Sequence, residues 1–454
     1  MPAYDLRPYP LRHPFALVAE LRRGLLPATA ALDAVGGDLV TSASRGLPSL
    51  HHVRHPDLVR EVLVDRNADL HKARGLRLAR VILGDGLLTA EAPQHTRQRR
   101  LVLPAFHHRR LVDYGATMAR LAAEEAERWA DGEVVDATAA AHRLTLAIAG
   151  ETLFGADVGE ATGAIAEALD QAFAGFDASQ FPLADKLTWL PTPAQRRTRA
   201  ARDTLDAIVY GLIAERRAAA RPGDDLLQML IDARDADTDA PMTDREIRDE
   251  ALTLLLAGHE TTAVALAWTL RALADHDDAQ TALHAELDAL GRDAAFDDLR
   301  ALPVTRAVVS EAMRLRPPAW AFSREAWRDT ALGGRAVRRG DTVLVAPYFL
   351  HRDARWWPEP ARFRLDRWLG GEAGRPEPAR AGPAHKFAYL PFSAGQRGCI
   401  GEPFAWAELV LSLAALARRW RVEAVGPAPG LSGTVTLRPS EPVRLRVARR
   451  EPAS

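Results

Sequence analysis

The sequence predicts a mainly α-helical fold with small β-sheets, and three observations support this class. The chain of 454 residues is 47% hydrophobic and 26% charged, the composition of a globular protein long enough to bury a large core. Residues 94–290 are rich in Ala, Leu, Arg and Glu, with apolar positions at helical spacing. Short β-like runs flank that stretch on both sides. A mixed architecture in which helices dominate follows from this pattern.

The predicted elements follow one another along the chain. In order, they are a β-containing part at about 35–70 with a strand pair within 38–54, a helix over Pro56–Asp65, a helical body at about 94–320, and β-like runs at 341–350 and 433–440. No internal repeat divides this pattern, and the Pro-rich stretches lie inside it. We therefore expect one domain over residues 1–454.

Charge and hydropathy argue against several classes of protein. The formal net charge is −1, so no global field would recruit nucleic acid. No window of about 18 uncharged apolar residues exists, and the first residues contain Asp5 and several prolines. We therefore expect no membrane anchor and no secretory signal. The single cysteine excludes an intramolecular disulfide, which agrees with a location in the reducing cytoplasm.

The longest predicted helix runs from Thr243 to about Ala274. Thr243 and Glu246 have the spacing of a capping box at its start. At 1.5 Å per residue this helix would span about 48 Å. A helix of that length must cross the whole core.

Cys399 lies in a glycine-rich loop that leads into an amphipathic helix starting near Glu402. The ordinary interpretation of a lone cysteine is a small, inert core residue. Here Gly395, Gly398 and Gly401 would let the backbone turn tightly and approach a flat ligand. The free N–H groups at the start of the next helix favour a thiolate, the form that an iron centre binds.

The loop matches the pattern FxxGxRxCxG at every fixed position, namely Phe392, Gly395, Arg397, Cys399 and Gly401. It resembles the haem-binding loop of the cytochrome P450 family. The resemblance implies that Cys399 is the axial ligand of the iron of haem b and that its thiolate favours O–O cleavage. Arg397 would hold a haem carboxylate with its two-pronged guanidinium. The family's fold places a long central helix over a haem that is sandwiched against the Cys-loop helix.

The segment AGHETT, within the long helix, is a second motif. Ala257 and Gly258 precede Thr261 by one turn, so the three residues share a helix face. In a purely structural interpretation, Thr261 bonds back to a main-chain carbonyl and Gly258 permits close packing. The segment also resembles the family's (A/G)Gx(D/E)T(T/S) motif. This resemblance implies that Gly258 opens a groove for a diatomic ligand, that Thr261 donates a hydrogen bond to it and that Glu260 passes protons inward.

Glu311 and Arg314 lie in LPVTRAVVSEAMRLRPP, an apolar-periodic helix that a Pro-Pro pair ends. Such a pair is usually a solvated surface pair. By the resemblance it meets a second arginine, and FRLDRW supplies Arg367. Leu365 and Asp366 replace the family's usual Pro and Glu, so this segment is a partial match. Because a buried cluster of charges must be mutually satisfied, we interpret these three charged residues as scaffold for the Cys loop.

His95 and Arg99, in QHTRQRRLVLPAF, resemble the family's HxxxR pattern, whose members bind haem propionates. The alternative is a basic surface helix, because several further arginines crowd the same stretch. Arg324, in AFSREA, occupies the place where many relatives have another propionate ligand.

The motifs occur in the family's order, and the resemblance extends over nearly the whole chain. It implies a monooxygenase that inserts one oxygen atom from O2 into a hydrophobic small molecule such as a terpenoid or a fatty acid. No flavin or iron–sulfur module is attached, so electrons would come from a ferredoxin or flavodoxin with its NAD(P)H-dependent reductase. The basic run at residues 107–110 would help dock an acidic donor.

Two other functions stay open. One is an H2O2-driven haem-thiolate peroxygenase, although such relatives typically lack the acid–alcohol pair Glu260–Thr261. The other is a non-catalytic haem sensor, although nothing in the chain resembles an output domain. For the substrate, residues 172–193, interpreted as a lid, and Trp320 and Phe322 near the expected pocket wall are apolar and aromatic. MRLRPPAW is also similar to a segment of carotenoid-oxidising relatives.

Overall fold

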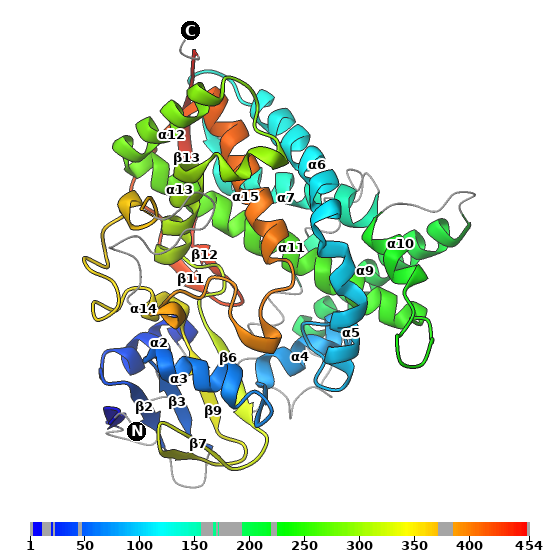
Figure 1. The fold of residues 1–454 in the computed structure, drawn as a ribbon, viewed down its shortest axis with the longest axis vertical. Helices are drawn as coiled ribbons and strands as arrows, with labels where there is room; N and C mark the ends of the chain where they lie inside the picture. The colour runs from blue at the N-terminus through cyan, green and yellow to red at the C-terminus, as the bar shows by residue number, and fades with distance from the viewer. Residues whose placement is uncertain are drawn as a thin grey trace. The chain divides into compact units, whose positions relative to one another are not determined.

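The computed structural model is mainly helical, with small β-sheets, as the sequence predicts (Figure 1). It describes residues 3–10, 20, 23–43, 48–155, 167–168, 171, 193–218, 225–370 and 385–451. The chain divides into two compact units. The first, the sheet unit, comprises 1–74, 307–399 and 430–440, and the second, the helical unit, comprises 75–306, 400–429 and 441–454. The assignment of residues 1–454 to one domain stays a prediction.

The sheet unit contains a six-stranded sheet in the order β1-β2-β3-β9-β6-β4. Its strands are β1 (Leu6–Pro8), β2 (Leu39–Ser42), β3 (Leu50–Val53), β4 (Leu70–Lys72), β6 (Phe322–Ala326) and β9 (Thr342–Val345). β1 and β2 pair in parallel, as do β3 and β9, and the other neighbours are antiparallel. The strand pair expected within 38–54 is confirmed as β2 and β3.

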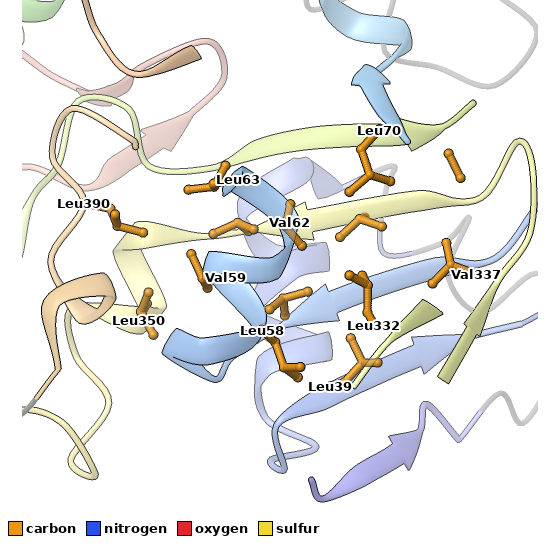
Figure 2. Close-up of a cluster of buried hydrophobic side chains, with 14 residues drawn as sticks. Leu39, Leu58, Val59, Val62, Leu63, Leu70, Leu332, Val337, Leu350 and Leu390 are labelled. Atoms are coloured by element: carbon orange, nitrogen blue, oxygen red, sulfur yellow. The ribbon is translucent and has the colours of Figure 1, made fainter. Parts of the chain in front are cut away.

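A hydrophobic core lies between this sheet and the helix that follows β3 (Figure 2). That helix, α3 (Pro56–Arg60), continues into a π-helical turn over Glu61–Asp65, which confirms the helix predicted there. Leu58 and Val62 are buried in one cluster with Val343 of β9. Proline suits the first turn of α3 because its missing N–H has no partner to lose there.

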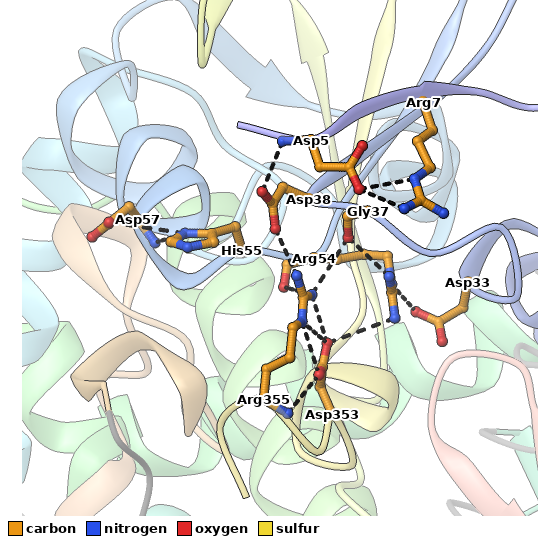
Figure 3. A network of polar contacts seen from close by, with 10 residues as sticks. All are labelled: Asp5, Arg7, Asp33, Gly37, Asp38, Arg54, His55, Asp57, Asp353 and Arg355. Carbon is orange, nitrogen blue, oxygen red and sulfur yellow. Dashed lines mark hydrogen bonds and ion pairs between the residues drawn. The ribbon is translucent and has the colours of Figure 1, made fainter. Parts of the chain in front are cut away.

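Ion pairs tie the N-terminal segments of the sheet unit to the chain around Asp353 (Figure 3). Arg355 donates to Asp38 at 2.6 Å and to Asp353 at 2.7 Å. Arg54 donates to Asp33 at 2.6 Å. Because the Arg355 side chain is 40% exposed, water screens its pairs, and each contributes at most about 1 kcal/mol. The network therefore positions these segments more than it stabilises them.

The rest of the sheet unit is short helices and hairpins. They are α2 (Leu25–Asp33), α13 (Pro303–Leu315, whose first turn belongs to the helical unit), α14 (Pro347–Leu350), the hairpin of β7 (Thr330–Leu332) and β8 (Arg335–Val337), and the hairpin of β11 (Leu431–Gly433) and β12 (Leu437–Pro439). The β-like run expected over 341–350 is wrong in its second half. Pro347 begins a short helix there, because its fixed φ suits a first helical turn.

The helical unit is built from nine helices within its described residues. These are α4 (Arg74–Leu83), α5 (Gln94–Val102), α6 (His108–Glu127), α7 (Ala137–Phe154), α9 (Pro193–Ala218), α10 (Leu226–Asp232), α11 (Asp244–Asp275), α12 (Asp277–Leu290) and α15 (Glu402–Arg419). A three-stranded sheet of β10 (Trp420–Ala424), β13 (Arg444–Arg449) and β5 (Val134–Asp136) completes it. The helices predicted near Thr243 and Glu402 are confirmed as α11 and α15.

The longest helix, α11, begins at a capping box. Thr243 Oγ1 accepts a hydrogen bond from the N–H of Glu246 at 3.2 Å, and Glu246 Oε2 accepts one from the N–H of Thr243 at 2.8 Å. α11 is also the one described helix that is long and apolar enough to cross a membrane, and 78% of its most apolar window is buried. That burial is typical of the core helix of a folded protein. Of the expected lid, residues 172–192 lie outside the described residues.

Candidate haem-thiolate site

The Cys loop of the sheet unit is closed by its own main chain. Residues Gly395–Arg397 form a 3-10 turn, in which the N–H of Gly398 donates to the carbonyl of Gly395 at 3.0 Å. The N–H of Cys399 donates to the carbonyl of Phe392 at 2.9 Å. The second bond holds Phe392 and Cys399, two fixed positions of the predicted motif, close to each other across the loop.

Two features of position 395 require glycine: there is no room for a side chain, and the backbone is in a left-handed conformation. Its φ is +72°, in the left-handed region that favours glycine, and a Cβ there would lie 2.3 Å from the main-chain oxygen of Leu63. That oxygen belongs to the π-helical turn over Glu61–Asp65. Asn67 Nδ2 also donates to Gln396 Oε1 at 3.0 Å, which fixes the same side of the loop.

Cys399 itself is exposed, although cysteine is among the residues most often buried. The interpretation as an inert core cysteine is therefore wrong. A sulfur that is accessible at the end of a tightly turned, glycine-containing loop fits a thiolate ligand to iron in a flat cofactor. Arg397, half-buried in the same turn, supplies a guanidinium near this end of the loop.

The predicted charged cluster exists within the sheet unit. Arg314 binds Glu311 with two parallel hydrogen bonds of 2.8 Å, and Arg367 Nε donates to Glu311 Oε1 at 3.1 Å. The indole of Trp368 donates to Glu311 Oε2 at 2.9 Å, and the N–H of Arg364 donates to Oε1 at 3.0 Å. Five donors thus surround one carboxylate whose side chain has no exposed surface.

The arginines of this cluster also bind main-chain carbonyls. Arg314 donates to the carbonyls of His351, Pro360 and Arg362 at 2.8 to 3.0 Å. Burial lowers the pKa of the Arg367 guanidinium, and the Glu311 carboxylate opposes that shift. Because every charge has a partner, the cluster can be buried and can act as the scaffold predicted from the sequence.

Sequence reasoning missed three residues that connect this cluster to the Cys loop. His351 Nε2 accepts a hydrogen bond from the N–H of Leu390 at 2.9 Å. The hydroxyl of Tyr389 donates to the carbonyl of Ser310 at 3.0 Å, and the indole of Trp357 donates to the carbonyl of Ala388 at 3.3 Å. All three side chains brace the chain just before the loop. The one sequence signal that could have identified these three residues is the apolar and aromatic composition of the segments around them.

The AGHETT motif forms the one open stretch in the interior of α11, away from its two ends. From Ile247 to Leu273 all residues are buried except Leu256, Ala257, Gly258 and Thr261. A Cβ on Gly258 would meet only Leu153 Cδ1, at 3.9 Å. Since the rest of the helix packs against neighbours, this face is left accessible where the motif lies. The predicted common face of Ala257, Gly258 and Thr261 is confirmed.

The hydroxyl of Thr261 is engaged with its own helix, as the structural interpretation anticipated. Thr261 Oγ1 donates to the carbonyl of Ala257 at 2.7 Å. Its two lone pairs stay available to accept, and rotation about χ1 or about the C–O bond would redirect the proton. Glu260 is 3% exposed, and its Oε2 lies 4.0 Å from Nδ1 of His142 on α7.

Glu408 on α15 is a second buried acid in the helical unit, and it belongs to none of the predicted motifs. Burial raises its pKa well above the ordinary range, and the nearby Thr262 hydroxyl only partly opposes this shift. That hydroxyl is committed to the carbonyl of Gly258 at 2.5 Å. Neither carboxyl oxygen of Glu408 has a hydrogen-bond partner among the described residues. Burial without a hydrogen-bond partner therefore favours the neutral form of Glu408.

Besides Arg397, the expected propionate ligands lie on two elements. His95 and Arg99 lie one turn apart on α5, where His95 is buried and Arg99 half-buried. Two other arginines of this helix serve structural pairs: Arg97 binds Asp235 and Glu246, and Arg100 binds Asp237. Arg324, on β6, is 6% exposed. The basic character of α5 is thus partly structural, which leaves Arg99 and His95 as the candidates.

The fold and the Cys loop together define the class as a haem-thiolate protein. A cytochrome P450 family model matches residues 36–447. The chain therefore belongs to the cytochrome P450 family, whose cofactor is a thiolate-ligated haem, and two of its relatives are named as oxygenases.

Three curated relatives come from Streptomyces. Cyclooctatin synthase of S. melanosporofaciens is 39% identical over 383 residues, covering 83% of this chain and 80% of that protein. Cyclooctat-9-en-7-ol 5-monooxygenase of the same organism is 35% identical, with coverages of 87% and 84%. Pentalenene oxygenase of S. avermitilis is 34% identical, with coverages of 85% and 84%. The solved haem domain of cytochrome P450DA superimposes with a TM-score of 0.83 at 26% identity, over 99% and 98% of the two chains.

Proposed function

We propose that this enzyme inserts one oxygen atom from O2 into a C–H bond of a terpenoid. The observation that carries the proposal is the exposed Cys399 at the end of a loop that matches the family's motif at every fixed position. The substrate class is supported by the relatives, two of which are named for oxidising cyclooctat-9-en-7-ol and pentalenene. A fatty acid is the alternative substrate.

We infer a division of labour among the residues that hold the cofactor. Cys399 would bind the iron of haem b, and Arg397, Arg324, Arg99 and His95 would hold its propionates by charge-assisted hydrogen bonds. Phe392, Gly395 and Gly401 would shape the loop around the sulfur. When bound, a thiolate-ligated haem supplies the one-electron and O2 chemistry that side chains lack.

The chain's own groups would manage oxygen and protons from α11. Ala257 and Gly258 leave room on the open face, and the Thr261 hydroxyl donates a hydrogen bond there once it turns away from the Ala257 carbonyl. Glu260, one residue away and buried, delivers protons toward that hydroxyl. Glu311, Arg314 and Arg367 act as scaffold rather than as catalytic residues.

Trp320, predicted near the pocket wall, is a core residue of the sheet unit. It is 2% exposed, and its indole N–H donates to the carbonyl of Thr434 at 3.1 Å. Phe322 is half-buried and stays a candidate for contact with the substrate.

Electrons would come from a ferredoxin or flavodoxin with its NAD(P)H-dependent reductase, and the enzyme would work in the cytoplasm. His107, His108 and Arg109 are exposed at the start of α6, where the Arg109 guanidinium supplies positive charge that would attract an acidic donor. If they do so, the reduction rate should fall as ionic strength rises.

Two measurements on the haem-loaded protein test this function. The reduced protein with carbon monoxide should show the strongly red-shifted Soret band of thiolate ligation, and its absence would sink the proposal. A spectral titration with terpenoids, fatty acids and steroids should show the tightest binding for a terpenoid. Turnover with H2O2 that exceeds turnover with redox partners would favour a peroxygenase instead, and no turnover with either would favour a sensor.

A further inference from the structure

We propose that His142, His259 and Glu260 form a binding site for a divalent transition-metal ion, of which Zn²⁺ is the best match. Among the described residues they are the one group of three or more His, Cys, Asp or Glu whose ligand atoms all lie within 4.8 Å of one another. His142 comes from α7, and the other two residues come from α11. This site differs from the haem site by its donors.

The geometry needs only a small contraction to bind zinc. A tetrahedral ion with bonds of about 2.0–2.1 Å holds its ligand atoms about 3.3 Å apart. His142 Nδ1 already lies 4.0 Å from Glu260 Oε2. The His142 and His259 rings meet edge to face, with centroids 5.1 Å apart. Rotation of the His142 side chain, which is 30% exposed, would supply the remaining movement.

A neighbouring hydroxyl contacts the imidazole of His259 and can orient it. Thr145 Oγ1 lies 2.9 Å from His259 Nδ1 and donates to the main-chain carbonyl of His259 at 3.2 Å. When the hydroxyl gives its proton to this carbonyl, His259 Nδ1 carries the hydrogen that the hydroxyl accepts. The lone pair then resides on Nε2, as a metal ligand requires. Threonine thus orients the imidazole in the way that outer partners orient histidine ligands in metal sites.

The donor set and its burial select the kind of ion. Two imidazoles and one carboxylate are the donors that zinc uses in open sites, whereas Mg²⁺ and Ca²⁺ prefer oxygen alone. His259 and Glu260 are each 3% exposed, so water competes little for the ion. The His142 side chain is 30% exposed, which would give the ion a way in from solvent.

A bound ion would also affect turnover, and this consequence rests on the proposed function. Zinc would hold the Glu260 carboxylate that we assign to proton delivery. We therefore expect Zn²⁺ to slow oxygenation reversibly, with recovery on addition of a chelator, while the CO-bound Soret band stays unchanged.

The test measures metal binding directly, so it does not depend on activity. Untagged, haem-loaded full-length protein is stripped with a chelator and dialysed against buffered Zn²⁺, and bound zinc is then counted by elemental analysis. One ion per chain is expected in the wild type, with an affinity at least about tenfold lower in His142→Ala. His108→Ala, which removes an exposed histidine on α6, is the matched control and should bind like the wild type.

A second variant keeps the test sharp if replacement of a buried ligand harms folding. Thr145→Val keeps the shape of the side chain but removes the orienting hydroxyl, so it should weaken zinc binding less than His142→Ala. X-ray absorption at the zinc edge should show two imidazoles and one or two oxygens. Wild type without stoichiometric zinc, or equal binding by wild type and His142→Ala, would overturn the proposal.

Discussion

The main-chain carbonyl of His351 accepts a hydrogen bond from Nη1 of Arg314 at 2.8 Å. The ring of the same histidine accepts one from the N–H of Leu390, nine residues before Cys399. One buried residue therefore couples the charged cluster of Glu311 to the chain that enters the Cys loop. The coupling holds only while the His351 ring is neutral, because a protonated Nε2 cannot accept.

This coupling predicts a pH dependence of stability. Burial, with Arg314 and Arg352 nearby, lowers the pKa of His351 from 6.5 to about 3. As the pH falls from about 6.5 to about 3, the unfolded chain takes up a proton that the folded chain refuses, so the stability contribution of neutral His351 is lost. The wild type should have a higher free energy of unfolding than His351→Gln, and urea unfolding should show this difference shrink by roughly 3–5 kcal/mol across this pH range. A constant advantage would contradict the assignment, and His107→Gln is the exposed control.

Replacing Glu311 with Gln should strongly destabilise the sheet unit. The amide cannot accept five hydrogen bonds as a carboxylate does, and it leaves two buried guanidinium groups without an anion. Loss of one partner of a buried pair costs about 3–5 kcal/mol. Thermal unfolding and haem content report the effect. Glu359→Gln, which breaks exposed pairs to Arg362 and Arg364, should cost less than about 1 kcal/mol.

Replacing Gly395 with Ala should disrupt the Cys loop. The new Cβ would meet the Leu63 carbonyl at 2.3 Å, a contact with rigid backbone, in addition to the strain of a φ of +72°. Gly426→Ala is the matched control, since its φ is +76° and nothing lies within 4 Å of its Cβ position. We expect about 1–2 kcal/mol lost in the control and a larger loss, with a smaller fraction of thiolate-type CO spectrum, in Gly395→Ala. Equal effects would show that conformation alone selects glycine.

Replacing Glu408 with Gln should stabilise the protein at neutral pH. Because the pKa of Glu408 is raised in the folded chain, the unfolded chain releases this proton first as the pH rises above about 4.5, which favours unfolding. The glutamine variant does not lose stability in this way. Its free energy of unfolding should therefore equal that of the wild type below that pH and exceed it by on the order of 1–3 kcal/mol at neutral pH. Denaturant titrations at two pH values measure it, with Glu215→Gln on α9 as the exposed control. A gain that is independent of pH would argue against a neutral Glu408.

Replacing Thr261 with Ala should uncouple electron use from product formation. We expect haem content to be kept while H2O2 release rises and the yield of product per NAD(P)H falls about tenfold or more. Thr269→Ala is the control, because Thr269 makes the same back-bond, to the Ala265 carbonyl at 2.7 Å, in a fully buried part of α11. If both variants uncouple alike, the effect comes from the helix and not from a hydroxyl on its open face.

Local signals predicted the elements that depend on neighbours in the chain. The cap of α11 is set by Thr243 and Glu246, three residues apart, and the observed helix begins at the expected position. The start of α15 at Glu402 follows equally from the glycines and proline around it. The β-like run at 341–350 failed because β-branched residues and a proline-initiated helix adjoin there, and apolar character alone cannot separate the two.

Contacts between distant residues were predicted only where the resemblance supplied them. Arg367 reaches Glu311 across 56 positions, and the motif identified it despite the substitutions at Leu365 and Asp366. His351 and Glu408 belong to no quoted motif, and their roles arise from burial. The same holds for the meeting of His142 with Glu260, which depends on how α7 packs against α11.

The cluster around Glu311 also bears on synthesis of the chain. Four of its five hydrogen bonds are completed by Arg314, Arg364 and Arg367, and the fifth by Trp368, so the acceptor emerges up to 57 residues before its last donor. Until Trp368 has left the ribosome, burial of this carboxylate is unfavourable because its hydrogen bonds are incomplete. We therefore expect α13 to remain exposed to water until then. A nascent chain stalled before this tryptophan should accordingly remain open to proteases around Glu311, whereas a somewhat longer one should be protected.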